Sequence, residues 1–260
     1  MWTPDALLAA IAGGLTGALT HPGFWWLAVT LAAAGIVRGF TGFGSALIFV
    51  PVAGIFLQPV QVIAIIALVE IASIGALVPR AWAHADRKQV GLLVLAALPT
   101  VPLGLMVMDA LDATIVRWIV AVFAGGTLIA LISGWHYTRA VTLPVILAIG
   151  AVAGLLGGMT GLTGPVVVLF YLAGGRMART VRANTILFLG LMDLVIVANL
   201  LVRGFADISV LWLAGALSVP YFIGMVTGQA LFDPSHERLY RRAALTVIAL
   251  AVLTGLPIWT

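Results

Sequence analysis

Long apolar runs separated by short gaps dominate this sequence and constrain its fold more than any other feature. Hydrophobic residues make up 63% of the 260 residues and charged residues 8%, and most of the charges fall in the gaps. A helix crosses a bilayer with about 20 apolar residues, so the chain is long enough for about eight or nine membrane segments. This pattern excludes a soluble monomer. The runs cover residues 24–37, 44–57, 60–79, 89–108, 113–133, 141–157, 165–174, 185–202, 208–231 and 243–259.

Basic residues concentrate in some of the gaps and are scarce in others. The gaps at Asp109–Asp112 and Arg203–Asp207 are poor in arginine and would face outward. This asymmetry is typical of membrane topology, so the net charge of +4 does not predict a nucleic-acid partner. Ten basic residues can share the cytoplasmic side: Arg80, Arg87, Lys88, Arg139, Arg176, Arg179, Arg182, Arg238, Arg241 and Arg242.

Two pairs of apolar runs are short and are interrupted by glycine and threonine. Gly39-Phe-Thr-Gly-Phe-Gly-Ser45 separates 24–37 from 44–57, and Gly157-Gly-Met-Thr-Gly-Leu-Thr-Gly-Pro165 separates 141–157 from 165–174. Lipid cannot satisfy the backbone groups that such breaks expose, so each break must be buried in protein or line a wet cavity. Residues 1–23 precede the first pair and lack the basic start of a signal peptide. We interpret them as a retained amphipathic or interfacial segment.

The two breaks match each other, which indicates an internal duplication of roughly 24–133 in 141–259. A shift of 119 aligns Gly39, Thr41 and Gly42 with Gly158, Thr160 and Gly161. A shift of 123 aligns Gln61, Glu70 and Arg80 with Asn184, Asp193 and Arg203, and a shift of 121 aligns Asp112 and Arg117 with Asp233 and Arg238. We therefore divide the chain into a first transmembrane repeat at 24–140 and a second at 141–260.

The positions of the arginines favour an inverted relation between the repeats. If Arg139 and Arg176 share one side, the short runs between them enter and leave on one face, as a re-entrant hairpin. Each repeat then has about three full spans plus one hairpin, and an odd number of crossings inverts the second repeat. We predict an all-α polytopic membrane protein of two inverted repeats. The rival layout counts each half-helix as a crossing and gives a parallel repeat, but it exports the three arginines between 176 and 182.

The second run of each pair is predicted to be a half-helix that begins inside the membrane. Thr163 is a candidate N-cap with Pro165 early in the helix, and Ser45 is the matching cap. A helix N-terminus carries unpaired N–H groups and about half a positive charge, so two facing ends predict a small anion-binding cavity. The alternative is tight helix packing through small residues. The predicted substrate-binding residues are Arg38, Gly39, Thr41, Gly42, Gly44, Ser45, Gln61, Gly158, Thr160, Gly161, Thr163, Gly164 and Asn184.

Three ionisable residues lie deep in the apolar runs. A bare charge in lipid costs at least about 2.5 kcal/mol, so Arg38 must be compensated. It binds an anionic substrate, pairs internally with Glu70 or Asp193, or snorkels to the membrane interface. Glu70 and Asp193 occupy matched mid-span positions. They either carry a coupling proton between access states or neutralise arginine in a static network.

Other polar residues allow alternatives. Gln61 and Asn184 could donate to a substrate or cap a helix start. Tyr171 and Tyr221 are possible hydroxyl donors, although we favour an interfacial position. The chain has no cysteine, and its four histidines show no paired spacing, so we expect no metal and no cofactor. An intramembrane enzyme would need a reactive constellation that the sequence lacks.

The two glycine-rich breaks together with Arg182-Ala-Asn184 resemble the TauE/SafE family of sulfite exporters, also called the TSUP family. The resemblance covers nearly the whole chain beyond residue 24. It implies a bacterial inner-membrane permease for sulfite, sulfoacetate or related sulfur-containing anions, and it supplies no set of catalytic residues. Met159 and Leu162 stand where many members continue with glycine.

The residues predict a secondary transporter of small anions that works by alternating access and uses the proton gradient, and the resemblance implies that the anions contain sulfur. The alternative is a passive anion channel with the same cavity. We expect no enzymatic activity, and the partners are the substrate anion and the bilayer, with a homodimer possible.

Overall fold

The computed structural model describes residues 4–134, 142–173, 178–205, 207–231 and 237–258, and all the regular secondary structure in these ranges is helical. Arg139, Arg176 and Asp233 lie outside the described residues. The helices of the first half are α1 (Pro4–Leu19), α2 (Phe24–Thr41), α3 (Ser45–Ala53), α4 (Pro59–Trp82), α5 (Arg87–Ala97), α6 (Thr100–Ala110) and α7 (Ala113–Ser133). Those of the second half are α8 (Leu143–Thr160), α9 (Gly164–Ala173), α10 (Ala178–Val202), α11 (Ile208–Ala230) and α12 (Glu237–Thr254).

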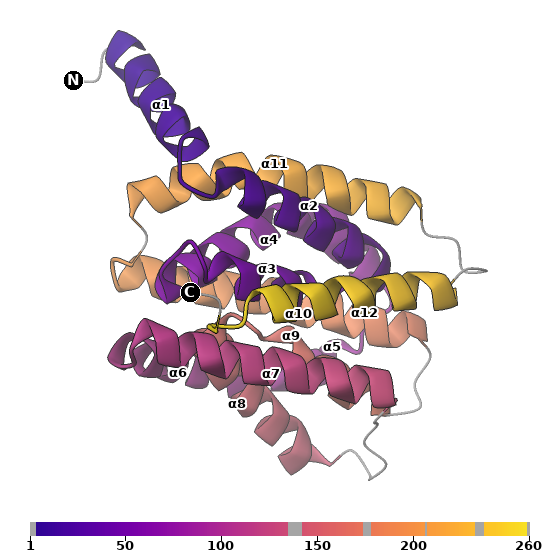
Figure 1. Cartoon of the computed structure of the whole chain (residues 1–260). Helices are drawn as coiled ribbons and strands as arrows, with labels where there is room; N and C mark the ends of the chain where they lie inside the picture. The colour runs from indigo at the N-terminus through magenta and orange to yellow at the C-terminus, as the bar shows by residue number, and fades with distance from the viewer. Residues whose placement is uncertain (1–3, 135–141, 174–177, 206, 232–236, 259–260) are drawn as a thin grey trace.

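Within the described residues, six helices are long and apolar enough to cross a membrane: α2, α4, α7, α8, α10 and α11. The bent pair α5 and α6, with an angle of 41° at the break before Thr100, makes a seventh span if it is counted as one. The all-α, multi-pass fold class is thereby confirmed. Helix α1 stands away from the bundle (Figure 1) and touches it where Gly14 meets Trp212 of α11.

Helices α2 and α8 are longer than the sequence predicted. Each contains 18 residues and continues past residues 37 and 157 into its glycine-rich motif, so the chain breaks later, at 42–44 and 161–163. The first residues of each motif stay helical because they pack tightly against another helix. Gly39 faces the backbone of α11 near Met225, and Gly158 faces the backbone of α6 near Val101.

The two halves interlock, and corresponding helices exchange partners. Helix α2 packs on α11, the fourth element of the second half, and α8 packs on α5 and α6, the fourth element of the first. The third elements, α4 and α10, pack against each other at the centre, and α12 packs on α3 as α7 packs on α9. Figure 1 shows α2 beside α11 on one side of the bundle and α8 near α6 and α7 on the other. The pairing brings both helix breaks to the middle of one bundle.

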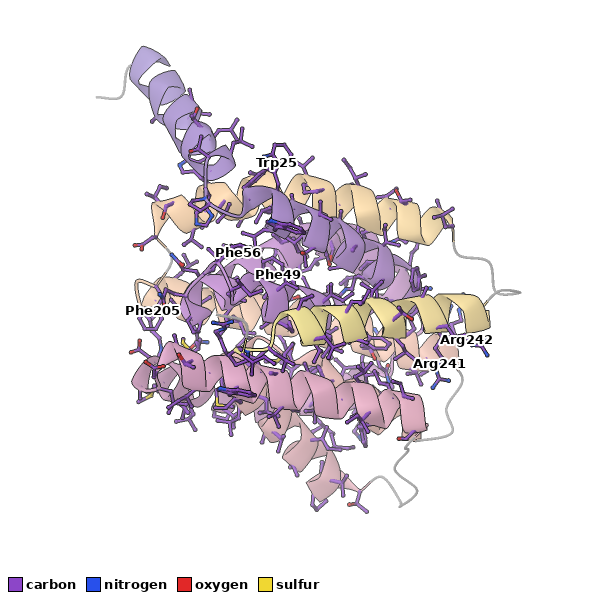
Figure 2. The ribbon with its side chains drawn as sticks, in the orientation of Figure 1. Trp25, Phe49, Phe56, Phe205, Arg241 and Arg242 are labelled. Atoms are coloured by element: carbon purple, nitrogen blue, oxygen red, sulfur yellow. The ribbon has the colours of Figure 1, made fainter. Side chains whose placement is uncertain are left out.

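The bundle has a basic end and an opposite end, which we call the outer end. Arg241 and Arg242 lie at the basic end and Phe205 lies at the outer end (Figure 2). At the basic end, Arg241 Nη2 donates to the carbonyl of Leu131 at 3.0 Å, which joins the end of α7 to the start of α12. Because successive helices reverse direction, α3 ends, and α4 and α7 begin, at the outer end.

The contact between α2 and α11 depends on glycine, which gives a first prediction. A Cβ on Gly228 would overlap the carbonyl oxygen of Ile36, whereas a Cβ on Gly215 of the same helix meets nothing within 4 Å. We expect Gly228→Ala to lower the melting temperature by several degrees, because overpacking costs about 1–3 kcal/mol. Gly215→Ala should leave it unchanged or raise it slightly. Thermal unfolding of both purified variants in detergent compares them, and equal melting temperatures would contradict the prediction.

Candidate anion-binding site

The two helix breaks have the same local geometry. Gly42 (φ 82°) and Gly161 (φ 76°) end α2 and α8 in the left-handed region, and each N–H donates at 2.8 Å to the carbonyl four residues back. The hydroxyl of Thr41 accepts from the N–H of Phe43 at 3.1 Å, and the hydroxyl of Thr160 accepts from Leu162 at 3.2 Å. Only glycine adopts this conformation without strain. The aligned motifs therefore form matching turns.

Helices α3 and α9 begin directly after these turns. Their first residues border one central cavity, which lies between α4 and α10. First-turn N–H groups have no partner within their own helix, so both ends present donors and positive potential to the cavity. The residues that the sequence predicted for the site and that line this cavity are Arg38, Gly44, Ser45, Glu70, Gly161, Thr163, Gly164 and Asp193.

Arg38 forms a buried ion pair inside this cavity. Its Nη1 lies 3.3 Å from Oε2 of Glu70, and the side chains are 2% and 5% exposed. The hydroxyl of Ser45 donates to the other carboxylate oxygen, Oε1 of Glu70. Of the alternatives for Arg38, the structure shows the internal pair with Glu70. The carboxylate of Glu70 thus already pairs with the cation that an anionic ligand would need.

Ser45 does not have the capping role that the sequence predicted. It is the first residue of α3, the N-cap is Gly44 with φ 94°, and no side-chain cap hydrogen bond forms. The hydroxyl is unavailable because it donates to Glu70. At the other break, α9 begins at Gly164 immediately after Thr163, with Pro165 in its first turn, as expected.

Asp193 brings a second carboxylate to the same cavity from α10. It is 5% exposed, and its Oδ2 has no hydrogen-bond partner among the described residues. Glu70 and Asp193, aligned by the repeat, interact across the interface between α4 and α10. One guanidinium thus faces two carboxyl groups, so the cluster is neutral only if one of them holds a proton.

Tyr221 is a residue of this cluster that the sequence misplaced. We expected Tyr171 and Tyr221 at the membrane interface, but both are buried, at 2% and 0% exposure. Tyr221 lies near Arg38, Glu70 and Asp193, and its hydroxyl is buried. The available signal was its position in the middle of an apolar span, directly after Pro220.

The cavity is small in this conformation. It leaves about 20 Å³ for the centre of a water molecule. A single water needs about 10–15 Å³ by this measure, so there is room for one or two waters and none for a sulfonate. In this conformation Arg38 is paired with Glu70, and the space beside the pair is too small for a sulfonate.

Several other predicted binding residues lie away from the central cavity. Gln61 accepts from the N–H of Gln58 at 3.1 Å at the start of α4, and Asn184 accepts from the N–H of Asp86 at 2.7 Å. Gly39 and Gly158 pack against neighbouring helices, so the small-residue alternative describes them. Thr41, Gly42 and Thr160 build the turns. A role for these residues in binding stays a prediction.

Arg182, near the start of α10, anchors the helix that precedes the first break. Its Nη2 donates at 2.8 Å to the carbonyl of Gly39 in the last turn of α2. With the bond from Asp86 to Asn184, this contact ties the start of α10 to α2 and to the turn between α4 and α5. These polar contacts close the basic end of the bundle around the cavity.

Comparison with known protein families identifies the family of this chain. A family model described as sulfite exporter TauE/SafE matches residues 26–254, from the first turn of α2 to the last residue of α12. No curated protein and no solved structure matches the chain. The matched region contains both helix breaks, the ion pair and Asp193. The chain therefore belongs to the TauE/SafE family of sulfite exporters.

Proposed function

We propose that the protein is a secondary transporter that moves a small sulfur-containing anion, such as sulfite, sulfoacetate or a related organosulfonate, across the bacterial inner membrane by alternating access. The observation that carries this proposal is the central cavity, where two half-helix N-termini and the guanidinium of Arg38 converge between the two halves of the chain. Donors from helix ends and a planar cation suit an oxyanion.

The closed cavity favours a carrier over a channel. A passive channel needs a continuous wet path, whereas this cavity holds one or two waters and is sealed by polar contacts at the basic end. The exchange of packing partners between the halves supports an inverted repeat, since α2 and α8 can then move against the opposite half in turn.

The ion pair supplies a mechanism for proton coupling. An anion and the carboxylate of Glu70 compete for Arg38, because both cannot sit against it in the closed cavity. A proton on Glu70, or one shared with Asp193, would free Arg38 for the substrate. Proton and anion would then occupy the site together and move in the same direction.

A double variant tests the binding site. Arg38→Met with Glu70→Gln removes both partners of the buried pair, which preserves packing better than the loss of one charge. We expect Kd for sulfoacetate to rise about 30-fold or more, because loss of a buried charged partner costs about 2–5 kcal/mol. Thermal shift and calorimetry measure the change, with Arg203→Gln, which lies outside the cavity, as the control. Unchanged affinity in the double variant would remove the site from the mechanism.

The competition for Arg38 predicts a pH dependence. We expect Kd for sulfoacetate to rise with pH by up to about tenfold per unit, the limit for one linked proton. Sulfoacetate is the probe because its own charge is constant across the neutral range. Glu70→Gln should give a tighter and flatter profile, and Asp193→Asn identifies which carboxyl holds the proton. A flat wild-type profile would exclude coupling through this pair.

Transport in proteoliposomes separates carrier from channel. With an acidic exterior, we expect labelled sulfoacetate to accumulate inside above its external concentration, and Glu70→Gln with Asp193→Asn should abolish accumulation but not equilibration. If the flux is passive and is changed neither by the pH gradient nor by these substitutions, the protein is a channel instead.

A further inference from the structure

A second cavity lies at the outer end of the bundle, directly beside the central one. It is enclosed by the end of α3, the start of α4, the first turns of α7 and the end of α8. All of these segments except the end of α8 reach the outer end, opposite the end that carries Arg241 and Arg242 (Figure 2). We call this cavity the outer vestibule.

A thin apolar partition separates the outer vestibule from the central cavity. Ile63 lines both spaces, and the second helix break borders both, with Thr160 on the vestibule and Gly161 on the central side. A Cβ on Gly161 would lie 3.5 Å from Ile63 Cγ1 and 3.5 Å from Val50 Cγ2, so these side chains close over the break. Movement of Ile63 and Val50 would join the two spaces.

The outer vestibule has a mostly apolar wall that carries one charge. Arg117 of α7 is the only charged residue among the described residues that line it. Its Nε and Nη2 atoms are buried, and its stem lies against Gly54 at the end of α3. A guanidinium beside a path for anions would raise the local anion concentration and the rate of binding.

The opposite side of the central cavity has a different character. Toward the basic end, polar contacts from Arg182 to Gly39 and from Asp86 to Asn184 tie the helices together. Toward the outer end, the side chains nearest Gly161 are apolar: Ile63, Val50 and Ile66. The vestibule is therefore the more direct route to the central cavity in this conformation.

We infer that the outer vestibule is a second binding site for the transported oxyanion, with Arg117 as its cationic group and the partition of Ile63 and Val50 as the gate to the central site. This inference rests on the proposed function. The vestibule now holds about 20 Å³ of free space, so the anion occupies it when the end of α3 moves away from α7.

Steady-state transport provides the first test. In proteoliposomes oriented with the outer end exposed, we expect Arg117→Gln to raise KM for sulfoacetate uptake about tenfold and to leave equilibrium Kd at the central site within twofold. Arg117→Lys, which keeps the charge, should restore much of the KM. Arg203→Gln is the control, because it removes an equal charge at the same end and outside the vestibule. Equal KM values in Arg117→Gln and Arg203→Gln would overturn the inference.

Thiol labelling provides a second, independent test, which the absence of native cysteine makes clean. Val120→Cys places a thiol on the vestibule wall. We expect an anionic methanethiosulfonate added at the outer end to label it, sulfoacetate to slow the labelling, and Arg117→Gln to remove that protection. Protection should persist in the Arg38→Met/Glu70→Gln background, because the vestibule binds the anion by itself.

These results separate this inference from the proposed function. If protection is absent while Arg38→Met/Glu70→Gln abolishes binding, the central site stands and the vestibule is only a passage. If protection persists and that double variant transports normally, the vestibule stands and the central site fails.

Discussion

A guanidinium in the middle of a membrane protein must be neutralised, and the architecture around Arg38 follows from that requirement. Lipid provides neither a counter-ion nor a hydrogen-bond acceptor for Arg38. Glu70 of α4 is the counter-ion, and the hydroxyl of Ser45 donates to its carboxylate. Asp193 from α10 then adds a second buried carboxyl group. The carboxylate that neutralises Arg38 is therefore the group with which an anionic ligand would have to compete.

The helix breaks meet a second requirement, which concerns the backbone. A turn inside a membrane exposes N–H and C=O groups that need partners. Here Gly42 and Gly161 return one N–H each to the preceding helix, and the hydroxyls of Thr41 and Thr160 accept another. The first-turn N–H groups of α3 and α9 also have no partner within their own helix, and the first residues of both helices border the central cavity. The unpaired backbone donors of both breaks are thus concentrated at the central cavity.

Periodic and repeated features of the sequence predicted much of this arrangement. Hydropathy gave the fold class, and the aligned motifs located both breaks to within a few residues. The charged positions Arg38, Glu70 and Asp193 were identifiable because charge in an apolar run is costly wherever it points. Features that depend on which way a residue faces could not be predicted. Gly39 and Gly42 look alike in sequence, yet one packs against α11 and the other ends α2. Likewise, the position of Ser45 suggested a cap, but its hydroxyl donates to the carboxylate of Glu70, 25 positions away.

The two halves contribute unequally to the cavity. At the positions that match Arg38 and Ser45, the second half has Gly157 and Gly164, and the methyl group of Thr163 lies where a side chain on Gly157 would have to begin. Two identical copies assembled about a twofold axis would contribute two arginines or none. A single cation at the centre is therefore possible only because the two halves carry different residues at these aligned positions.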